Sequence, residues 1–244
     1  MKRTKNMSKL SKIILSSVLS VICAASLVAC TNANTDDPTG ASAATTNDNT
    51  ANGNNETSDN NDADTDDSSD TASTDGELLS GIHHAEIVVQ DYGSIYLELD
   101  ANTAPITVTN FVNLANDGFY DGLTFMRVMA DFMIQGGDPN KDCTGGSGTN
   151  IKGEFTNNGI ENNISHTRGT ISMARGGYSM DSASSQFFIC NADAVFLDGD
   201  YAAFGTVTDG MDVVDAITND FAAYNGVIYN KDIQPVITTI KVID

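Results

Sequence analysis

The stretch that decides the fold runs from Phe125 to Asp138 and reads FMRVMADFMIQGGD. It contains two runs with strand-like composition, Phe125–Val128 and Phe132–Gln135, separated by a short break. The pair Gly136–Gly137 ends the second run, as glycines commonly do where a strand gives way to a turn. The pattern predicts two consecutive β-strands.

The same stretch holds the side chains of a candidate binding site. Arg127 supplies a fixed cation. Phe132 and Met133 supply large apolar groups, and Gln135 supplies an amide. Alternate side chains of a strand share a face, so Met133 and Gln135 point one way and Phe132 the other, unless a twist or bulge at the glycines brings them together. An arginine in a strand is more often a solvated edge charge, so this stretch alone only suggests a site.

A second stretch, Ser184–Ile189, reads SSQFFI and strengthens this interpretation. Together the two stretches resemble the cyclophilin family of peptidyl-prolyl isomerases, whose signature reads approximately F-x-R-V, F-M-I-Q-G-G-D, T-G-G, S-M-A, S-Q-F-F-I, L-D-G and F-G. The chain carries these blocks in the same order at Phe125–Val128, Phe132–Asp138, Thr144–Gly146, Ser172–Ala174, Ser185–Ile189, Leu197–Gly199 and Phe204–Gly205. The resemblance extends from near His83 to Asp244.

The resemblance implies a groove that binds proline-containing polypeptides and assigns roles to its side chains. Arg127 matches the family's catalytic arginine, and Gln135 matches the amide that contacts the peptide and orients that arginine. The other substrate-binding positions are Phe132, Met133, Phe188 and Leu197 in the proline pocket, Ala174 and the backbone of Arg175 at the groove edge, Gln186 beside them, and Phe196 and Tyr201 at the rim. For Phe188 and Leu197 the alternative is ordinary core packing, which is the expectation for Phe187.

Three rim positions depart from the family pattern. Arg175 stands where many members have Asn; because the backbone makes that contact, we expect the role to survive. Tyr201 replaces a common His. Phe196 stands where many members carry a Trp that donates an indole N–H bond to cyclosporin, a bond that Phe cannot make. We therefore expect cyclosporin to inhibit weakly.

The domain begins with a predicted hairpin and a helix. Ala85–Gln90 and Ser94–Leu99 alternate apolar and polar residues on either side of a turn. A helix follows, for which Asn102 or Thr103 can serve as the N-cap and Pro105 suits the first turn. Its apolar stripe is Val108, Phe111, Val112, Leu114 and Ala115, and Gly118 ends it.

The rest of the domain reads as short strands with one more helix. Strands are predicted at Gly169–Ala174, Gln186–Cys190, Ala203–Val207 and Val236–Val242, and a helix at Met211–Ile217. Many short strands with two helices favour a β-barrel. The resemblance implies a mainly β fold, namely a closed eight-stranded antiparallel β-barrel capped by two α-helices, with the active groove on its outer face.

The first 29 residues read as a lipoprotein signal peptide (1–29). Five basic residues and no acid precede an apolar, serine-containing stretch that is short for a spanning helix. The stretch ends in Leu27–Cys30, LVAC, which resembles a bacterial lipobox. We expect lipidation at Cys30, because two acyl chains on one residue suffice for stable membrane attachment. An ordinary cleaved signal or an uncleaved anchor is the alternative.

Residues 30–77 are predicted to be a disordered acidic tether. The segment is rich in Asn, Asp, Ser and Thr, and contains 12 acidic residues and no basic ones between Thr31 and Glu77. Such a composition cannot bury enough apolar surface to offset its ordering entropy. The isomerase domain is expected to occupy 78–244. From these features we expect the protein to lie outside the cytoplasm, anchored to the cell membrane.

Net charge argues against a nucleic-acid partner. The chain carries 33 acidic and 12 basic residues, a formal net charge of −21 at pH 7. Five of the basic residues lie within the signal peptide, so no basic patch remains to neutralise phosphates. We expect a soluble, monomeric domain.

Other chemistries find no support in the sequence. The glycine-rich loops Gly136–Asp138 and Thr144–Gly148 lack the spacing of a phosphate-binding loop and read as turns framing a peptide groove. His166 is expected in a polar loop, and the histidine spacing suggests no zinc site. Cys143 and Cys190 are expected to be unpaired, and nothing marks either as a nucleophile. No cofactor and no metal are predicted.

The sequence therefore predicts a peptidyl-prolyl cis-trans isomerase that assists the folding of secreted or surface proteins. The alternative is a lipid-anchored peptide-binding module or chaperone that keeps the groove without useful turnover; an intact Arg127 argues against it. A solute-binding lipoprotein is a third alternative, although such proteins are normally larger and two-lobed.

Overall fold

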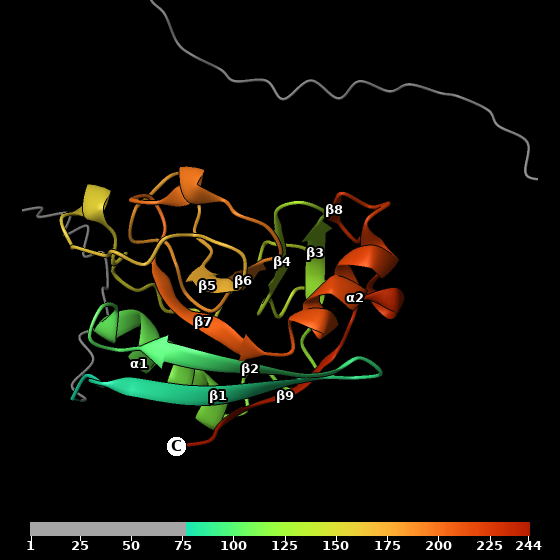
Figure 1. The fold of residues 1–244 in the computed structure, drawn as a ribbon, viewed down its shortest axis with the longest axis horizontal. Helices are drawn as coiled ribbons and strands as arrows, with labels where there is room; N and C mark the ends of the chain where they lie inside the picture. Colours follow the sequence, from blue (N-terminus) through green and yellow to red (C-terminus); the bar gives the residue numbers. More distant parts are fainter. Residues whose placement is uncertain (1–76) are drawn as a thin grey trace, which may run out of the picture. The chain divides into compact units, whose positions relative to one another are not determined.

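The computed structural model of the chain describes residues 77–244, which form a strongly curled sheet with two α-helices (Figure 1). The predicted signal peptide (1–29), the lipidation site at Cys30 and the tether (30–77), apart from its last residue, lie outside the described residues. No helix within residues 77–244 combines the length and apolar character needed to cross a membrane.

The elements of the domain follow the predicted order. The strands are β1 (Ile82–Val89), β2 (Gly93–Asp100), β3 (Phe125–Met129), β4 (Met133–Gly136), β5 (Thr170–Met173), β6 (Phe187–Cys190), β7 (Ala203–Asp209), β8 (Gly226–Val227) and β9 (Ile237–Val242). The helices are α1 (Pro105–Asn116) and α2 (Met211–Phe221), with short 3-10 helices at Thr156–Asn158, Val195–Leu197 and Lys231–Ile233. The predicted hairpin, both helices and the later strands are confirmed, and β8 is an element that the sequence pattern did not reveal.

The expectation of a closed eight-stranded barrel is wrong. The sheet has nine strands in the order β8-β3-β4-β6-β5-β7-β2-β1-β9, and its end strands β8 and β9 do not pair with each other. The seam between the two ends of the sheet is crossed by one isolated bridge, between Thr124 and Val236. Three backbone hydrogen bonds lie beside it, from Phe125 to Pro235 (2.9 Å), from Ile237 to Leu123 (2.8 Å) and from Gly122 to Ile237 (2.8 Å). Pro235 has no N–H to donate, so this side of the seam cannot continue as a regular ladder.

The first helix begins differently from the prediction. Its N-cap is Ala104, which offers no side-chain acceptor, and neither Asn102 nor Thr103 caps it. The carboxylate of Glu154, far along the chain, accepts bonds from the N–H groups of Ile106 (2.9 Å) and Thr107 (2.7 Å). A carboxylate at this end also complements the helix dipole, so a tertiary contact replaces the local cap.

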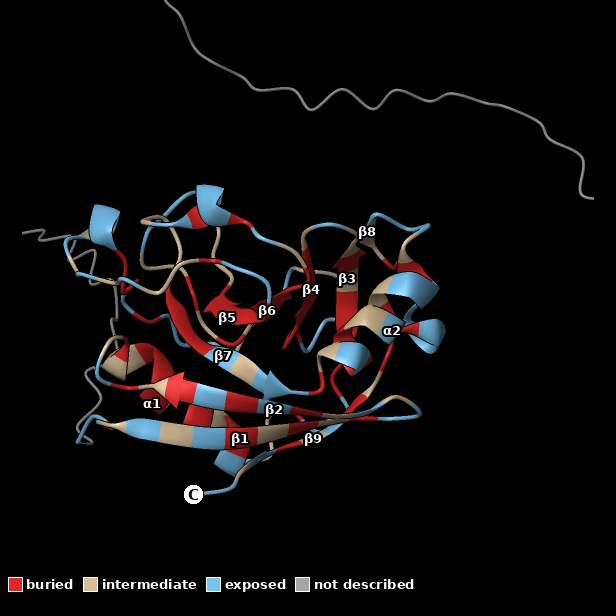
Figure 2. Ribbon diagram, viewed as in Figure 1, coloured by how far each residue is buried: buried red, intermediate tan, exposed pale blue. Residues whose placement is uncertain are grey.

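Strands β4 and β6 divide their side chains between two apolar clusters. Ile134, Phe187 and Ile189 join the main core, whereas Met133 and Phe188 join a second, smaller cluster. Figure 2 shows that β4, β5 and β6 are buried along their whole length, unlike the partly exposed β1 and β2. Side chains of these central strands therefore have packing partners on both faces of the sheet.

Candidate active site

One groove of about 940 Å³ collects every substrate-binding residue predicted from the sequence. Its lining includes Arg127, Phe132, Met133, Gln135, Ala174, Arg175, Gln186, Phe188, Phe196, Leu197 and Tyr201. These residues span positions 127–201, so the fold brings distant parts of the chain together as the resemblance implied. Their individual roles remain predictions.

The register of three neighbouring strands aligns the centre of the groove. Arg127 of β3 lies opposite Gln135 of β4, and Gln135 lies opposite Phe188 of β6. Directly paired residues project to the same face of a sheet, so these three side chains form one row. Phe132 precedes β4 in a turn where Asp131 has a positive φ of 58°. The ladder also has a register shift between Phe125 and Arg127, opposite Gly136 and Gln135, so the bulge anticipated near the glycine pair is present as well. Phe132 and Met133 both line the groove.

Arg127 is held by uncharged partners. Its Nη1 donates to Gln135 Oε1 (2.9 Å), and its Nη2 lies 3.0 Å from the Met129 sulfur. The guanidinium carbon is 6.0 Å from the centre of the Phe132 ring. Among residues 77–244, Arg127 forms no ion pair. A guanidinium has five N–H donors, so donors remain for a ligand in the groove.

The apolar floor of the groove is deeply buried while its rim is open. Met133, Phe188 and Leu197 are 1%, 4% and 8% exposed, whereas Phe196 is 70% exposed. The Phe132 and Phe196 rings pack 5.5 Å apart. Such an arrangement offers a pocket for a compact apolar ring beside a fixed cation.

Arg175 turns its side chain into the wall of the groove. The guanidinium carbon lies 4.9 Å from the centre of the Tyr201 ring and 5.3 Å from that of Phe155, and Nε donates to the Asp200 carbonyl (2.8 Å). The side chain therefore holds neighbouring loops together. Only the backbone of Arg175 is then available to contact a bound peptide. The adjacent Ala174 N–H already donates to the Gln186 carbonyl (2.9 Å).

The structure adds groove residues that were not among the predicted substrate-binding residues. They are Cys143, Thr144, Gly145, Gly146, Gly148, Asn150, Gly176, Tyr178, Ser182, Ser184 and Val227. The interpretation of the loop Thr144–Gly148 as a frame for the groove is confirmed, and glycine spacing was the signal for it. Val227 belongs to the two-residue strand β8, which is too short to show any periodicity.

His166 lies in a loop with polar neighbours, as predicted, but the sequence did not reveal that the residue is buried. Its side chain is 1% exposed, with Nδ1 2.8 Å from Asp198 Oδ1 and Nε2 2.9 Å from Ser172 Oγ. The imidazole stacks on the Phe188 ring at 6.0 Å. Ser172 is fully buried, so this Ser–His–Asp arrangement cannot meet a substrate and instead backs the proline pocket.

Neither thiol of the described domain is activated. Cys143 and Cys190 are both free. Burial raises the pKa of Cys143, an effect that the nearby Arg127 only partly offsets, and burial raises the pKa of Cys190 to about 12. A nucleophilic cysteine needs a lowered pKa, so the site offers no thiolate chemistry.

Comparisons with known proteins agree on one family. The family model described as "Cyclophilin type peptidyl-prolyl cis-trans isomerase/CLD" matches residues 84–242. A peptidyl-prolyl cis-trans isomerase of Helicobacter pylori is 47% identical over 127 residues, which cover 51% of this chain and 74% of that protein. Peptidyl-prolyl cis-trans isomerase B of Bacillus subtilis is 42% identical over 132 residues, 54% of this chain and 88% of that protein.

Solved structures give the same answer. The crystal structure of a Cryptosporidium parvum cyclophilin-type isomerase superposes with a TM-score of 0.58 at 27% identity, covering 67% of this chain and 99% of that one. A second structure of that protein, in the presence of the dipeptide Ala-Pro, gives a TM-score of 0.57. Sequence, fold and groove thus converge, and the chain belongs to the cyclophilin-type peptidyl-prolyl cis-trans isomerase family.

Proposed function

We propose that Arg127 catalyses rotation about X–Pro bonds in peptides whose proline ring sits among Phe132, Met133, Phe188 and Leu197. The observation that carries this assignment is the row Arg127–Gln135–Phe188, which sets a fixed guanidinium beside a buried apolar floor. The Ala-Pro dipeptide used with the Cryptosporidium relative supports a ligand of this class.

Rotation about an X–Pro bond requires a correctly positioned donor rather than an acid, a base or a nucleophile. Amide conjugation makes rotation slow, with a barrier of roughly 18–20 kcal/mol. Catalysis needs a site that binds the twisted amide better than the planar one. A donor aimed at the proline nitrogen does this, because the nitrogen lone pair accepts a hydrogen bond only after conjugation is broken.

Arginine suits this task for two reasons. It is charged at every physiological pH, and its planar fork can serve the proline nitrogen and a neighbouring carbonyl together. One preorganised donor contributes about 3–4 kcal/mol to a transition state. A 10⁵-fold acceleration needs about 7 kcal/mol, so the apolar pocket must supply the rest by positioning and desolvation.

The test is cis-to-trans isomerisation of an Ala-Pro test peptide by the purified protein, with Arg127→Ala beside it. Circular dichroism confirms that both proteins are folded. Fast turnover by the wild type that collapses in the variant supports the assignment. A folded wild type without turnover would refute it and favour a peptide-binding module.

We further propose that Cys30 is lipidated and that the enzyme, as a monomer, assists the folding of secreted or surface proteins outside the cytoplasm. The lipobox-like LVAC at Leu27–Cys30 and the acidic segment that follows it support this placement. Fractionation of cells provides the test. The wild type should sediment with membranes, and Cys30→Ala should not. Equal partitioning of the two proteins would overturn the anchor.

A further inference from the structure

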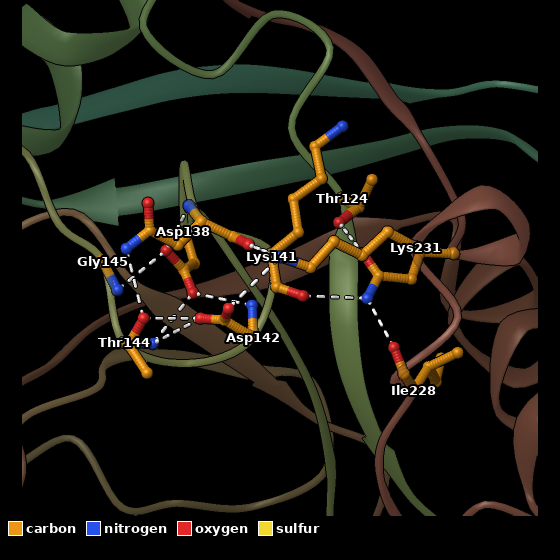
Figure 3. Close-up of polar contacts among 10 residues, drawn as sticks. Thr124, Asp138, Lys141, Asp142, Thr144, Gly145, Ile228 and Lys231 are labelled. Atoms are coloured by element: carbon orange, nitrogen blue, oxygen red, sulfur yellow. Dashed lines mark hydrogen bonds and ion pairs between the residues drawn. The ribbon is translucent and has the colours of Figure 1, made fainter.

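The loop that follows β4 is built around the carboxylate of Asp138. This side chain is fully buried. Its Oδ1 accepts bonds from the backbone N–H groups of Asn140 (2.7 Å) and Gly145 (3.0 Å), and its Oδ2 from those of Asp142 (3.0 Å) and Thr144 (3.1 Å) (Figure 3). Four backbone N–H donors converge on this one carboxylate, so the Asp138 side chain fixes the path of the loop.

Gly145 connects this loop to the catalytic row. A Cβ at position 145 would overlap Asp138 Oδ1, so the carboxylate packs directly against a residue that has to be glycine. The Gly145 carbonyl accepts a bond from Gln186 Nε2 (2.7 Å). Gln186 Oε1 accepts from Gln135 Nε2 (2.8 Å), and Gln135 Oε1 accepts from Arg127 Nη1 (2.9 Å). An unbroken series of hydrogen bonds thus runs from Asp138 to Arg127.

The polarity of this series is set at both ends. A carbonyl only accepts and a guanidinium only donates. The Gly145 carbonyl therefore requires Gln186 to present its NH₂ group to the loop and its oxygen to Gln135. Gln135 in turn presents its oxygen to Arg127. If the Gly145 carbonyl moved, Gln186 could flip, and Gln135 could then flip in response and present an N–H to the guanidinium, which would push Arg127 away.

Other contacts hold the loop without involving Gly145. Lys231 Nζ donates to the Asn140 carbonyl (2.6 Å) and to Asp142 Oδ2 (3.2 Å), and Gln234 Nε2 donates to the Lys141 carbonyl (3.0 Å) (Figure 3). The Asp142 carboxylate also accepts from the Thr144 hydroxyl (2.6 Å) and shares the Thr144 N–H with Asp138 (3.2 Å). Asp142 thus has the same charge as Asp138 and lies in the same loop, yet its carboxylate makes no contact with Gly145 among these bonds.

We propose that Asp138 is a positioning residue for catalysis: through Gly145, Gln186 and Gln135 it sets the orientation of Arg127. The inference rests on the proposed role of Arg127. The carboxylate touches no substrate. It acts on the transition state alone, because it orients the donor that the twisted amide uses.

The test compares Asp138→Asn with Asp142→Asn, which removes the same charge from the same loop. Asp138→Asn should lower kcat for a proline peptide about ten-fold and change KM less than about two-fold. Asp142→Asn should change both constants less than about two-fold. In a Gln186→Leu background, Asp138→Asn should produce no further loss, because its effect passes through Gln186. Equal effects of the two Asn variants, or full additivity with Gln186→Leu, would overturn the inference.

A measurement on the wild type keeps the inference testable if Asp138→Asn does not fold. Hydrogen exchange by NMR should show protected backbone amides at Gly145 and Thr144 and one slowly exchanging side-chain NH₂ group at Gln186. Fast exchange at these groups would contradict the inference. If Arg127→Ala abolishes turnover while a folded Asp138→Asn retains it, only the positioning role fails; if Arg127→Ala is fully active, the proposed catalytic role fails first.

Discussion

The two faces of β6 carry apolar side chains in strict alternation, yet they border different kinds of surface. On the inner face, Phe187 packs edge-on against Phe111 at 5.5 Å and Tyr120 at 5.6 Å, within a core sealed by α1 and the opposite strands. On the outer face, Phe188 contacts His166 and Tyr201 within a small cluster.

The difference lies in what covers each face. The inner face is closed by the chain's own regular elements. The outer face is covered by loops and the short 3-10 helix Val195–Leu197, and this cover leaves the groove open beside Phe188. The same alternation therefore produces a core on one side and a binding site on the other. Adjacent residues of one strand thus contribute mainly to stability on the inner face and mainly to function on the outer face. The four predictions that follow test this separation.

The largest expected effect is on the inner face. Phe187→Ala should lower the free energy of unfolding by about 3–5 kcal/mol, because it leaves a cavity in a closed aromatic core. Phe188→Ala should cost less, since water from the groove can fill the space. Urea denaturation of both variants measures this difference, and equal losses would show that the two faces are packed alike.

Arg127→Ala should separate function from stability most cleanly. We expect kcat/KM to fall about 100- to 1,000-fold, because one preorganised donor to the transition state is lost. The melting temperature should hardly change, since Arg127 forms no ion pair within residues 77–244. Lys241→Ala, on the exposed side of β9, serves as a control for the loss of one positive charge and should retain full activity.

Phe196→Trp probes the open rim. Phe196 is 70% exposed beside Phe132, so a larger ring can be added without disturbing the core. The indole N–H should restore one hydrogen bond to cyclosporin and lower its inhibition constant up to about ten-fold. Inhibition assays on both proteins provide the measurement. Nanomolar inhibition of the wild type would show that the Trp is dispensable.

The smallest effect concerns the residue behind Phe188. Burial lowers the pKa of His166 from its ordinary value of 6.5, and this outweighs the neighbouring Asp198, which raises it. The unfolded chain then binds a proton at higher pH than the native protein does, so this contribution to stability is lost as the pH falls below about 6.5. Between about pH 7.5 and about pH 5.5, the wild type should lose more thermal stability than His166→Gln. Equal losses would contradict this.

Much of the site could be predicted from the sequence, because the motif blocks carry the groove residues at characteristic positions along the chain. The blocks around Arg127, Gln186 and Leu197 placed side chains that the structure brings into one groove. Residues outside such blocks could not be assigned in this way. His166 was correctly predicted to lie in a loop because its neighbours are polar, but only the packing of Phe188 against it shows that it is buried.

The sequence by itself determined the features that depend on local periodicity. Alternation of apolar residues and the positions of glycines predicted where the strands occur along the chain. Pro105 and Gly118 mark the two ends of the first helix. These features follow from backbone geometry over a few residues, which neighbouring side chains decide.

Only the tertiary structure decided the features that join distant segments. The Phe125 N–H donates to the Pro235 carbonyl at the seam of the sheet, Glu154 caps a helix that begins at Pro105, and Asp138 is joined to Arg127 through two glutamines. Each depends on a hydrogen bond between groups far apart in the chain, whose partners are set by where the folded segments come to lie and by the need to satisfy every buried polar group.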